Sequence, residues 1–223
     1  MSVTAFTFIR EDSKRLPKKS IKYLEGIPLF EYSFKKFGNS NYIDRCIAYT
    51  NSSFVKEYTT KHINCNVEVM NRDTRLDADV TFNDIMKSVI DVIETEYVLY
   101  FCVTSPFIKK ETIDEIIQKV LESNKYDSAF TAKEIKNFCW FNNQPLNYSL
   151  NEKIPFTQNL EPIIVESSGF YLFKKSQFKK SKRRIGKHPY IKTIDAIQSH
   201  DIDYEEDFVL AENFIRSGLV DAV

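Results

Sequence analysis

Six cationic side chains lie close together near the start of the chain, directly after an apolar stretch that is typical of a buried strand. They are Arg10, Lys14, Arg15, Lys18, Lys19 and Lys22, and we call residues 10–22 the basic loop. Lysine and arginine side chains at the end of a strand can bind phosphate oxygens and neutralise charge as pyrophosphate leaves. A run of charges is more often a solvated loop, but the position of this one directly after a strand favours phosphate binding.

Two carboxylates with a spacing suited to metal binding lie near the other end of the sequence, at Asp201 and Asp203. Residues two apart on an extended segment point to the same side, so both carboxylates can bind one hard cation such as Mg²⁺. Taken alone, an Asp-x-Asp pair before a helix is more often a solvated turn that caps the helix.

Two further segments carry polar side chains whose role the residues alone leave open. Arg72 is placed to reach a phosphate or a base, and Asp79 and Thr81 precede a helix whose N-terminus can face an anion. An ordinary helix cap, with Arg72 in a surface ion pair, fits equally well. Residues 156–171 form a polar stretch that either covers a ligand or a partner subunit, or is a surface loop.

Alternating strands and helices are expected to position these groups. Apolar patterns predict strands at residues 3–9, 43–50, 67–70, 97–103, 127–132, 170–173 and 190–197. Apolar residues at helical spacing, with typical capping residues, predict helices at residues 30–38, 51–62, 81–94, 112–121 and 205–216. Residues 137–162 are predicted to be irregular, and residues 174–187 to form a solvated basic loop.

This alternation favours right-handed βαβ units and a mostly parallel sheet. Ligands bind at the carboxyl ends of the strands in such sheets. The loops that follow the strands should therefore line one rim, and they are residues 10–22, 51–53, 72–79 and 104–106.

The composition excludes several classes of protein. The chain has 223 residues, with 31 Lys plus Arg against 31 Asp plus Glu, so there is no overall positive field for nucleic acid or anionic lipid. The four cysteines form no CxxC pair, which argues against a zinc site. No signal-peptide pattern precedes the first strand, and no apolar run approaches the ~20 residues that span a bilayer. We therefore expect one cytoplasmic domain over residues 1–223, with no membrane or nucleic-acid partner.

Taken in order, these segments resemble the acylneuraminate cytidylyltransferase (CMP–sialic acid synthetase) family from about Thr7 to Ile215. The family opens with Arg-Gly-Gly-Ser-Lys-Arg-hydrophobic-Pro-x-Lys-Asn, and the run from Arg10 to Ser20 is similar to it. Six further segments match family motifs in the correct order: Gly26-Ile-Pro-Leu29, residues 72–79, Cys102-Val-Thr-Ser-Pro106, Asp127-Ser-Ala-Phe-Thr131, Gln158-Asn-Leu-Glu-Pro162 with Glu166 and Gly169, and Asp201-Ile-Asp203 through Asp207.

The resemblance implies a three-layer, Rossmann-like nucleotidyltransferase fold with a mostly parallel sheet. It implies a homodimer in which an arm at about residues 137–170 crosses between subunits. It also implies CTP as donor, Mg²⁺ as cofactor, an acidic sugar as acceptor, and a part in surface-glycan synthesis. An acceptor oxygen would attack the α-phosphorus and pyrophosphate would leave, with catalysis mainly by positioning and charge neutralisation.

Site residues carry over from the family by position. The catalytic cations would be Arg10, Lys14 and Lys19. The nucleotide site would comprise these three with Ser13, Arg15, Arg72, Asp79 and Thr81. The acceptor would contact Cys102, Thr104, Ser105, Gln158 and Glu166. The metal ligands would be Asp201 and Asp203.

The chain departs from the family's pattern at three points. The Gly-Gly pair, which lets the backbone approach phosphate, is Glu11-Asp12. The Asn after the last lysine is Ser20, and the strand-end glutamine associated with the sugar is Cys102. Because a thiol replaces an amide, the acceptor is expected to be atypical.

Two other functions are compatible with the same residues. One is a non-catalytic or regulatory nucleotide-binding protein with a degraded site, because acidic Glu11 and Asp12 would repel a triphosphate. The other is a glycosyltransferase that binds a sugar-nucleotide metal through Asp201 and Asp203. The basic loop argues against a glycosyltransferase, since the sugar-nucleotide donor of such an enzyme carries only a diphosphate.

Overall fold

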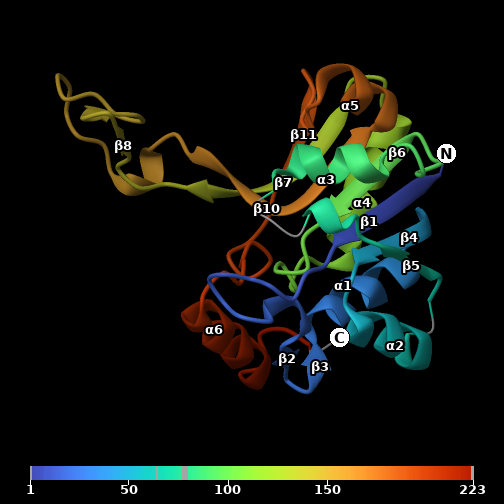
Figure 1. Cartoon of the computed structure of the whole chain (residues 1–223). Helices are drawn as coiled ribbons and strands as arrows, with labels where there is room; N and C mark the ends of the chain where they lie inside the picture. Colours follow the sequence, from blue (N-terminus) through green and yellow to red (C-terminus); the bar gives the residue numbers. More distant parts are fainter. Residues whose placement is uncertain (1, 64, 77–79, 222–223) are drawn as a thin grey trace.

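A seven-stranded sheet forms the centre of the computed structural model, which describes residues 2–63, 65–76 and 80–221 (Figure 1). The strand order is β11-β7-β10-β6-β1-β4-β5. These strands are β1 (Val3–Phe8), β4 (Ile43–Thr50), β5 (Val67–Asn71), β6 (Tyr97–Phe101), β7 (Ser128–Ile135), β10 (Ile163–Lys174) and β11 (Pro189–Thr193). Neighbouring strands are parallel except where β10 pairs antiparallel with β6 and β7. The predicted α/β fold with a mostly parallel sheet is confirmed.

Helices cover both faces of the sheet, because its strands carry apolar residues on both sides. In β1, Val3 and Ala5 belong to the core cluster on one face, whereas Phe6 belongs to the cluster on the other. The first face is covered by α1 (Leu29–Gly38), α2 (Ser53–His62) and α4 (Lys110–Glu122), and the second by α3 (Phe82–Val89) and α5 (Lys175–Ser181). The result is the expected three-layer architecture.

A third core cluster joins the basic loop to the C-terminal helix α6 (Glu205–Arg216). Leu16 of the loop, Ile202 and Phe208 are all buried in this cluster. The small ribbon of β2 (Tyr23–Leu24) and β3 (Ile27–Pro28) contributes to it as well. This packing brings the segment around residue 202 to the basic loop.

The arm extends away from the sheet (Figure 1). Its outer part contains a two-stranded ribbon formed by β8 (Trp140–Phe141) and β9 (Gln144–Pro145). A short 3₁₀ turn, η3 (Thr157–Asn159), precedes β10. The large apolar side chains exposed in this region are Phe138, Trp140, Phe141, Leu146, Leu150, Ile154 and Phe156.

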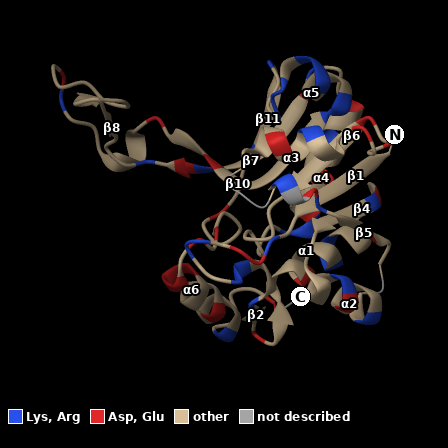
Figure 2. Ribbon diagram, in the orientation of Figure 1, with Lys and Arg blue, Asp and Glu red and all other residues tan. Residues whose placement is uncertain are grey.

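Two sequence expectations require correction. The segment expected to be a basic loop contains α5, which Phe178 anchors because its buried ring packs against Phe173, while Lys179 and Lys180 are exposed. Figure 2 shows the basic residues of this segment in blue. The strand expected from residue 170 begins at Ile163. Its pairing with β7 shifts register between Glu166 and Tyr171, and that shift interrupts the apolar pattern.

Helix α3 is shorter than expected, because it runs from Phe82 to Val89 rather than to residue 94. Among the described residues, no helix combines the length and the apolar character that crossing a membrane requires.

Candidate functional site

A cavity of about 490 Å³ opens at the carboxyl ends of β1 and β6, and we call it the central cavity. Seven of its lining residues come from the basic loop, three follow β6, and two precede α6. Nine of these twelve are among the predicted site residues: Arg10, Ser13, Lys14, Arg15, Lys19, Cys102, Thr104, Asp201 and Asp203. The structure therefore brings together side chains that lie almost 200 residues apart in the sequence.

The basic loop holds a defined shape through its backbone. Lys18 adopts a left-handed conformation with φ of 56°, and its N–H donates to the carbonyl of Glu11 over 3.1 Å. Leu16 is buried, and its carbonyl accepts the N–H of Lys19 at 3.2 Å. The buried Leu16 fixes the loop to the body of the protein, while Arg15 and Lys19 line the cavity.

The acidic segment, residues 201–203, is held to the loop that follows β6. The N–H of Ile202 donates to the carbonyl of Thr104 at 2.9 Å, and the side chain of Ile202 is fully buried. Asp201 and Asp203 lie on either side of it in sequence, and both line the central cavity. The sheet edge thus fixes the direction of both carboxylates.

Asp203 is paired with two cations of the basic loop. Its Oδ2 lies 2.5 Å from Arg15 Nη1, and its Oδ1 lies 2.8 Å from Lys19 Nζ. Lys19 is nearly buried, so water and salt screen the attraction between Lys19 and Asp203 far less than they screen a surface ion pair. The carboxylate therefore occupies the cations that were predicted to hold a triphosphate.

Asp201 carries an oxygen that no group satisfies within the described part of the chain. Its Oδ1 is buried and has no hydrogen-bond partner there. Burial raises the pKa of this carboxyl, although a hydrogen bond with Thr104 acts in the opposite direction. Because buried polar atoms are normally paired, this oxygen is suited to a cation or a donor from a ligand.

Part of the lining of the central cavity is apolar and aromatic. It is formed by Phe8, Val80, Phe82, Ile85 and Tyr100. The cavity thus offers both cations and flat apolar rings, which suits a nucleotide with its charged phosphates and planar base.

A second cavity of about 830 Å³, the rim cavity, lies on the other side of Asp201. It is lined by Glu166, Lys133 and His200 among others, and Asp201 lines both cavities. Glu166 accepts a hydrogen bond from the hydroxyl of Tyr171 at 2.6 Å. Because the central cavity and the rim cavity share Asp201, they can hold two reactants next to one carboxylate.

Cys102 lines the central cavity at the end of β6. Its N–H donates to the carbonyl of Gly169 at 2.9 Å. Burial raises the pKa of the Cys102 thiol to about 11, so the group is neutral at physiological pH. The thiol therefore supplies no charge to a ligand and only weak hydrogen bonding.

Besides Glu166 and Arg72, three predicted site residues with described positions do not line the central cavity. Ser105 is buried, and its Oγ occupies the space that a side chain at Gly169 would need. Thr81 forms a capping box with Asp84 at the start of α3. Gln158 is exposed in η3 of the arm.

Arg72 lies next to the central cavity but lines a different one. Its guanidinium carbon lies 5.3 Å from the centre of the Phe8 ring. It lines a cavity of about 470 Å³, the outer cavity, together with Arg10, Glu11 and Asp12. Asp79, the remaining predicted nucleotide residue, lies outside the described residues.

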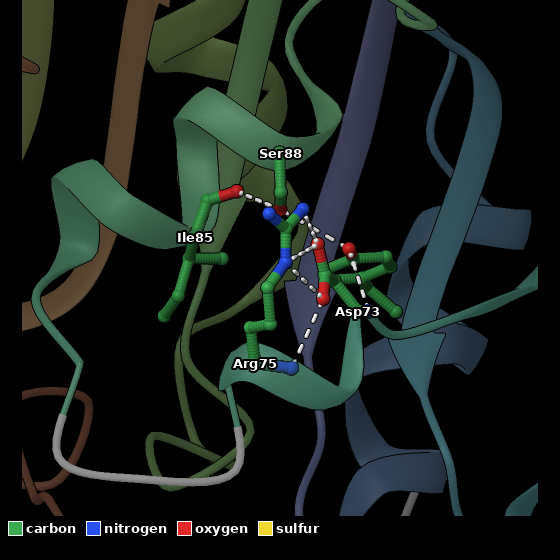
Figure 3. Close-up of polar contacts among 5 residues, drawn as sticks. Asp73, Arg75, Ile85 and Ser88 are labelled. Atoms are coloured by element: carbon green, nitrogen blue, oxygen red, sulfur yellow. Dashed lines mark hydrogen bonds and ion pairs between the residues drawn. The ribbon is translucent and has the colours of Figure 1, made fainter.

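A short network fixes the segment that follows Arg72 against α3 (Figure 3). The N–H of Asp73 donates to the hydroxyl of Tyr49 at 3.0 Å, and that hydroxyl lies 3.1 Å from Ser88 Oγ. Ser88 in turn donates to the carbonyl of Ile85 at 2.7 Å. Hydrogen bonds from Arg75 lower the pKa of Asp73 to about 2. This network holds the strand end that carries Arg72.

The acidic pair of the basic loop faces away from the central cavity. Glu11 and Asp12 line the outer cavity with Asn51, Ser52 and Ser53, and neither is among the described residues that line the central cavity. Ser52 Oγ donates a hydrogen bond to Glu11 Oε1. Because neither carboxylate lines the central cavity, the expected repulsion of a phosphate bound there is weaker.

Arg184 is a residue that the sequence reasoning missed, because it lies in the segment predicted to be a solvated loop. Its guanidinium carbon lies 3.7 Å from the centre of the Tyr171 ring, and Nη2 donates to that residue's hydroxyl at 3.0 Å. Nη2 also lies 3.7 Å from Glu166 Oε2, beside the rim cavity. Nothing in the local sequence distinguishes it from its basic neighbours, since its partners are distant in the chain.

Comparison with known proteins gives matches over most of the chain. A family model described as "Cytidylyltransferase" matches residues 8–216. The chain is 23% identical over 219 residues to N-acylneuraminate cytidylyltransferase A of Danio rerio. The alignment covers 94% of this chain and 50% of that protein. The chain thus spans about half the length of this curated relative.

Solved structures with a similar fold have low sequence identity. CMP:2-keto-3-deoxy-manno-octonic acid synthetase, solved in complex with CTP, superposes with a TM-score of 0.72 at 12% identity and covers 98% of this chain and 100% of its own. The bifunctional IspDF of Campylobacter jejuni gives a TM-score of 0.66 at 15% identity, and the match covers 93% of this chain and 53% of that one. The 4-diphosphocytidyl-2C-methyl-D-erythritol synthase of Anaerococcus prevotii gives 0.64 at 14% identity and covers 96% of each chain.

Proposed function

This chain belongs to the cytidylyltransferase family, and from that premise we propose that it transfers CMP from CTP to an acidic sugar of the sialic acid or other ulosonic acid type, with release of pyrophosphate. The observation that carries the proposal is the central cavity, where cations of the basic loop face Asp201 and Asp203. The similarity to N-acylneuraminate cytidylyltransferase and to a CTP-bound sugar-acid synthetase supports both the donor and the class of acceptor.

In the proposed reaction, an acceptor hydroxyl attacks the α-phosphorus of CTP and loses its proton. The bond from the α-phosphorus to the bridging oxygen breaks, and pyrophosphate leaves with the electron pair. Arg10, Lys14 and Lys19 neutralise the negative charge that develops on the leaving group. Ser13 and Arg15 hold further phosphate oxygens, and Arg72, Thr81 and Asp79 are proposed to act on the nucleoside side.

We propose that Asp201 and Asp203 hold Mg²⁺ together with phosphate oxygens. The orphaned Oδ1 of Asp201 supports this, because a cation would satisfy it. Within residues 2–63, 65–76 and 80–221, no group of three or more His, Cys, Asp or Glu side chains forms a metal site. A site of two carboxylates completed by substrate is common for Mg²⁺. When bound, the ion would offset phosphate charge and polarise the phosphoryl group.

The acceptor is proposed to occupy the rim cavity, on the far side of Asp201 from the triphosphate. Glu166 lines this cavity, whereas Thr104 and Cys102 line the central cavity, which shares Asp201 with it. Gln158 would reach the acceptor only from the arm of a second subunit, because it is exposed on its own chain. Ser105 is proposed to support the site from beneath rather than to touch the acceptor.

We further propose that residues 1–223 act as one nucleotidyltransferase domain and form a homodimer through the arm. The exposed apolar side chains of the arm, such as Trp140, Phe141 and Phe156, support this. Such a group of apolar side chains at the end of a projecting segment is typical of a surface that another protein covers. A second copy of the chain is the occupant that the resemblance implies.

The test is a screen of nucleotides against acidic sugars, with pyrophosphate release as the readout. We expect release with CTP, Mg²⁺ and an acidic sugar, and we expect Asp201→Ala and Asp203→Ala each to abolish it. Unchanged release in both variants would remove the metal assignment. Calorimetric binding of CTP without turnover on any acidic sugar would instead favour a non-catalytic nucleotide-binding protein.

A further inference from the structure

We propose that Glu11 is a positioning residue for the triphosphate: it fixes the basic loop to the first turn of α2 through Ser52, with its carboxylate facing away from the phosphates. This inference rests on the proposed function, because it concerns how the basic loop receives CTP. It assigns a use to an acidic side chain that stands where the resembling family has glycine.

Both polar parts of Glu11 take part in fixing the loop. Its side-chain Oε1 accepts a hydrogen bond from Ser52 Oγ, and its carbonyl accepts the N–H of Lys18 at 3.1 Å. The first bond joins the loop to α2, and the second closes the loop on itself. Residues 11–18 are therefore restrained at both ends before any ligand arrives.

Ser52 is itself held rigidly, so it is a firm attachment point. Its Oγ accepts the N–H of Val55 at 3.1 Å and so caps α2, while its own N–H donates to Thr50 Oγ1 at 3.1 Å. Ser52 and Thr50 are both buried. The loop is thus connected through one hydroxyl to the end of β4 and to the start of a helix.

The position of the Glu11 carboxylate also suits its charge. It lies at the N-terminus of α2, where the helix dipole stabilises an anion. Glu11 lines the outer cavity, whereas Arg15 and Lys19 line the central cavity. Glu11 and these two cations therefore line different cavities, whereas Arg10 lines both.

Restraining the loop matters because ordering it on binding costs conformational entropy. A Gly-Gly pair lets the backbone approach phosphate but leaves the free loop flexible. When Glu11 is bonded to Ser52, part of the conformational entropy of the basic loop is already lost during folding, so less is lost on binding CTP. Loss of the tether should therefore raise KM for CTP and change kcat little.

The test compares variants that separate the tether from the charge. Glu11→Gln keeps an acceptor for Ser52 and removes the charge. Glu11→Ala removes the acceptor, and Ser52→Gly removes the donor while retaining an acceptable helix cap. Asp12→Asn is the matched control, because it removes a neighbouring charge in the same outer cavity.

We expect Glu11→Ala and Ser52→Gly each to raise KM for CTP roughly ten-fold, as expected for the loss of a hydrogen bond to a charged group. The double variant should be no worse than either single variant, because both remove the same contact. Glu11→Gln and Asp12→Asn should stay within about two-fold of the wild type. A lower KM in Glu11→Gln or Glu11→Ala would show that charge repulsion dominates, and it would overturn the proposal.

Amide hydrogen exchange of residues 10–19 in the ligand-free protein gives a second readout that needs no CTP. Exchange should be faster in Glu11→Ala and Ser52→Gly and unchanged in Glu11→Gln. Unchanged exchange in the first two variants would overturn the tether. If exchange is faster in these two variants but the wild type does not bind CTP, the proposed function is overturned while the hydrogen bond between Glu11 and Ser52 is still shown to restrain the loop.

Discussion

Lys19 and Asp203 form an ion pair across the central cavity, with Nζ and Oδ1 2.8 Å apart. The two residues come from opposite ends of the chain, and each was predicted to contact a different part of the substrate complex. The pair means that in the ligand-free protein the cation and the carboxylate satisfy each other. On the proposed function, triphosphate oxygens would displace Asp203 from Lys19, and this displacement would free Asp203 for the proposed Mg²⁺.

Replacement of Asp203 by asparagine should therefore have opposite effects on binding and on turnover. Without metal, CTP should bind Asp203→Asn about five-fold more tightly than the wild type, because the competing charge is gone. With Mg²⁺, turnover should fall at least about ten-fold, because a metal ligand is weakened. Calorimetry in the presence of a chelator measures the first effect, and pyrophosphate release measures the second.

The matched control for this variant is Glu205→Gln, which removes an acid paired with Lys22. It should leave both quantities close to those of the wild type. Weaker binding of metal-free CTP by Asp203→Asn would contradict the competition between Asp203 and phosphate.

Lys19 should contribute more to CTP binding than other cations of the basic loop. Its side chain is nearly buried, so its charge acts in a poorly solvated place. Truncation by Lys19→Ala should weaken CTP binding by roughly ten- to hundred-fold. Lys22→Ala is the control, since Lys22 pairs with Glu205 and does not line the central cavity within the described residues. Equal losses in the two variants would show that only the overall charge of the loop matters.

Much of this arrangement could be predicted from the sequence, and the reasons are physical. Strand and helix periodicity located β4 and α6 at their observed residues, because each buries one regular apolar face. The alternation in Asp201-Ile-Asp203 predicted the direction of both carboxylates, since Ile202 must be buried. The rule that ligands bind at the carboxyl ends of strands then placed the basic loop opposite them.

The partners of individual side chains could not be predicted, because they depend on contacts between distant segments. The contact of Glu11 with Ser52 depends on the pairing of β1 with β4, which brings the start of α2 beside the basic loop and which no local pattern reports. The same holds for Arg184, whose partner Tyr171 lies in an antiparallel strand with a register shift. Ser105 was expected to contact the acceptor, and its burial against Gly169 follows from a close approach that the sequence does not indicate.

Lys36 should make the stability of the protein depend on pH. Burial lowers the pKa of this lysine to about 7, and its ammonium donates to the carbonyl of Pro106. Between about pH 7 and 10 the unfolded chain would bind more protons at Lys36 than the folded protein, so the contribution of Lys36 to the free energy of unfolding should rise with pH over this range. The neighbouring Tyr32 does not titrate there, since burial raises its pKa to about 12.

Denaturant unfolding at several pH values measures this effect. From pH 7 to 10, the free energy of unfolding of the wild type should rise by about 1 kcal/mol or more relative to that of Lys36→Met. Lys35→Met on the same helix should follow the wild type. A constant difference between the wild type and Lys36→Met across this range would contradict the lowered pKa.

The arm should determine the oligomeric state. The paired substitution Phe141→Ser with Phe156→Ser removes two exposed rings of the arm and touches no core cluster of the described residues. We expect the wild type to have the mass of a dimer in light scattering and the variant to have that of a monomer. Thr60→Ser, on the exposed side of α2, is a control that should remain dimeric. A monomeric wild type over the whole accessible concentration range would contradict the proposed role of the arm.

The most direct test of the central claim is ³¹P NMR of CTP turnover, with Mg²⁺ and the acidic sugar that gives the most pyrophosphate. The α-phosphorus signal should become that of a phosphodiester while the β- and γ-phosphorus atoms appear together as pyrophosphate. The substitution Asp201→Ala should prevent both changes. Appearance of CDP with orthophosphate would contradict the account, because it would place the broken bond between the β- and γ-phosphates.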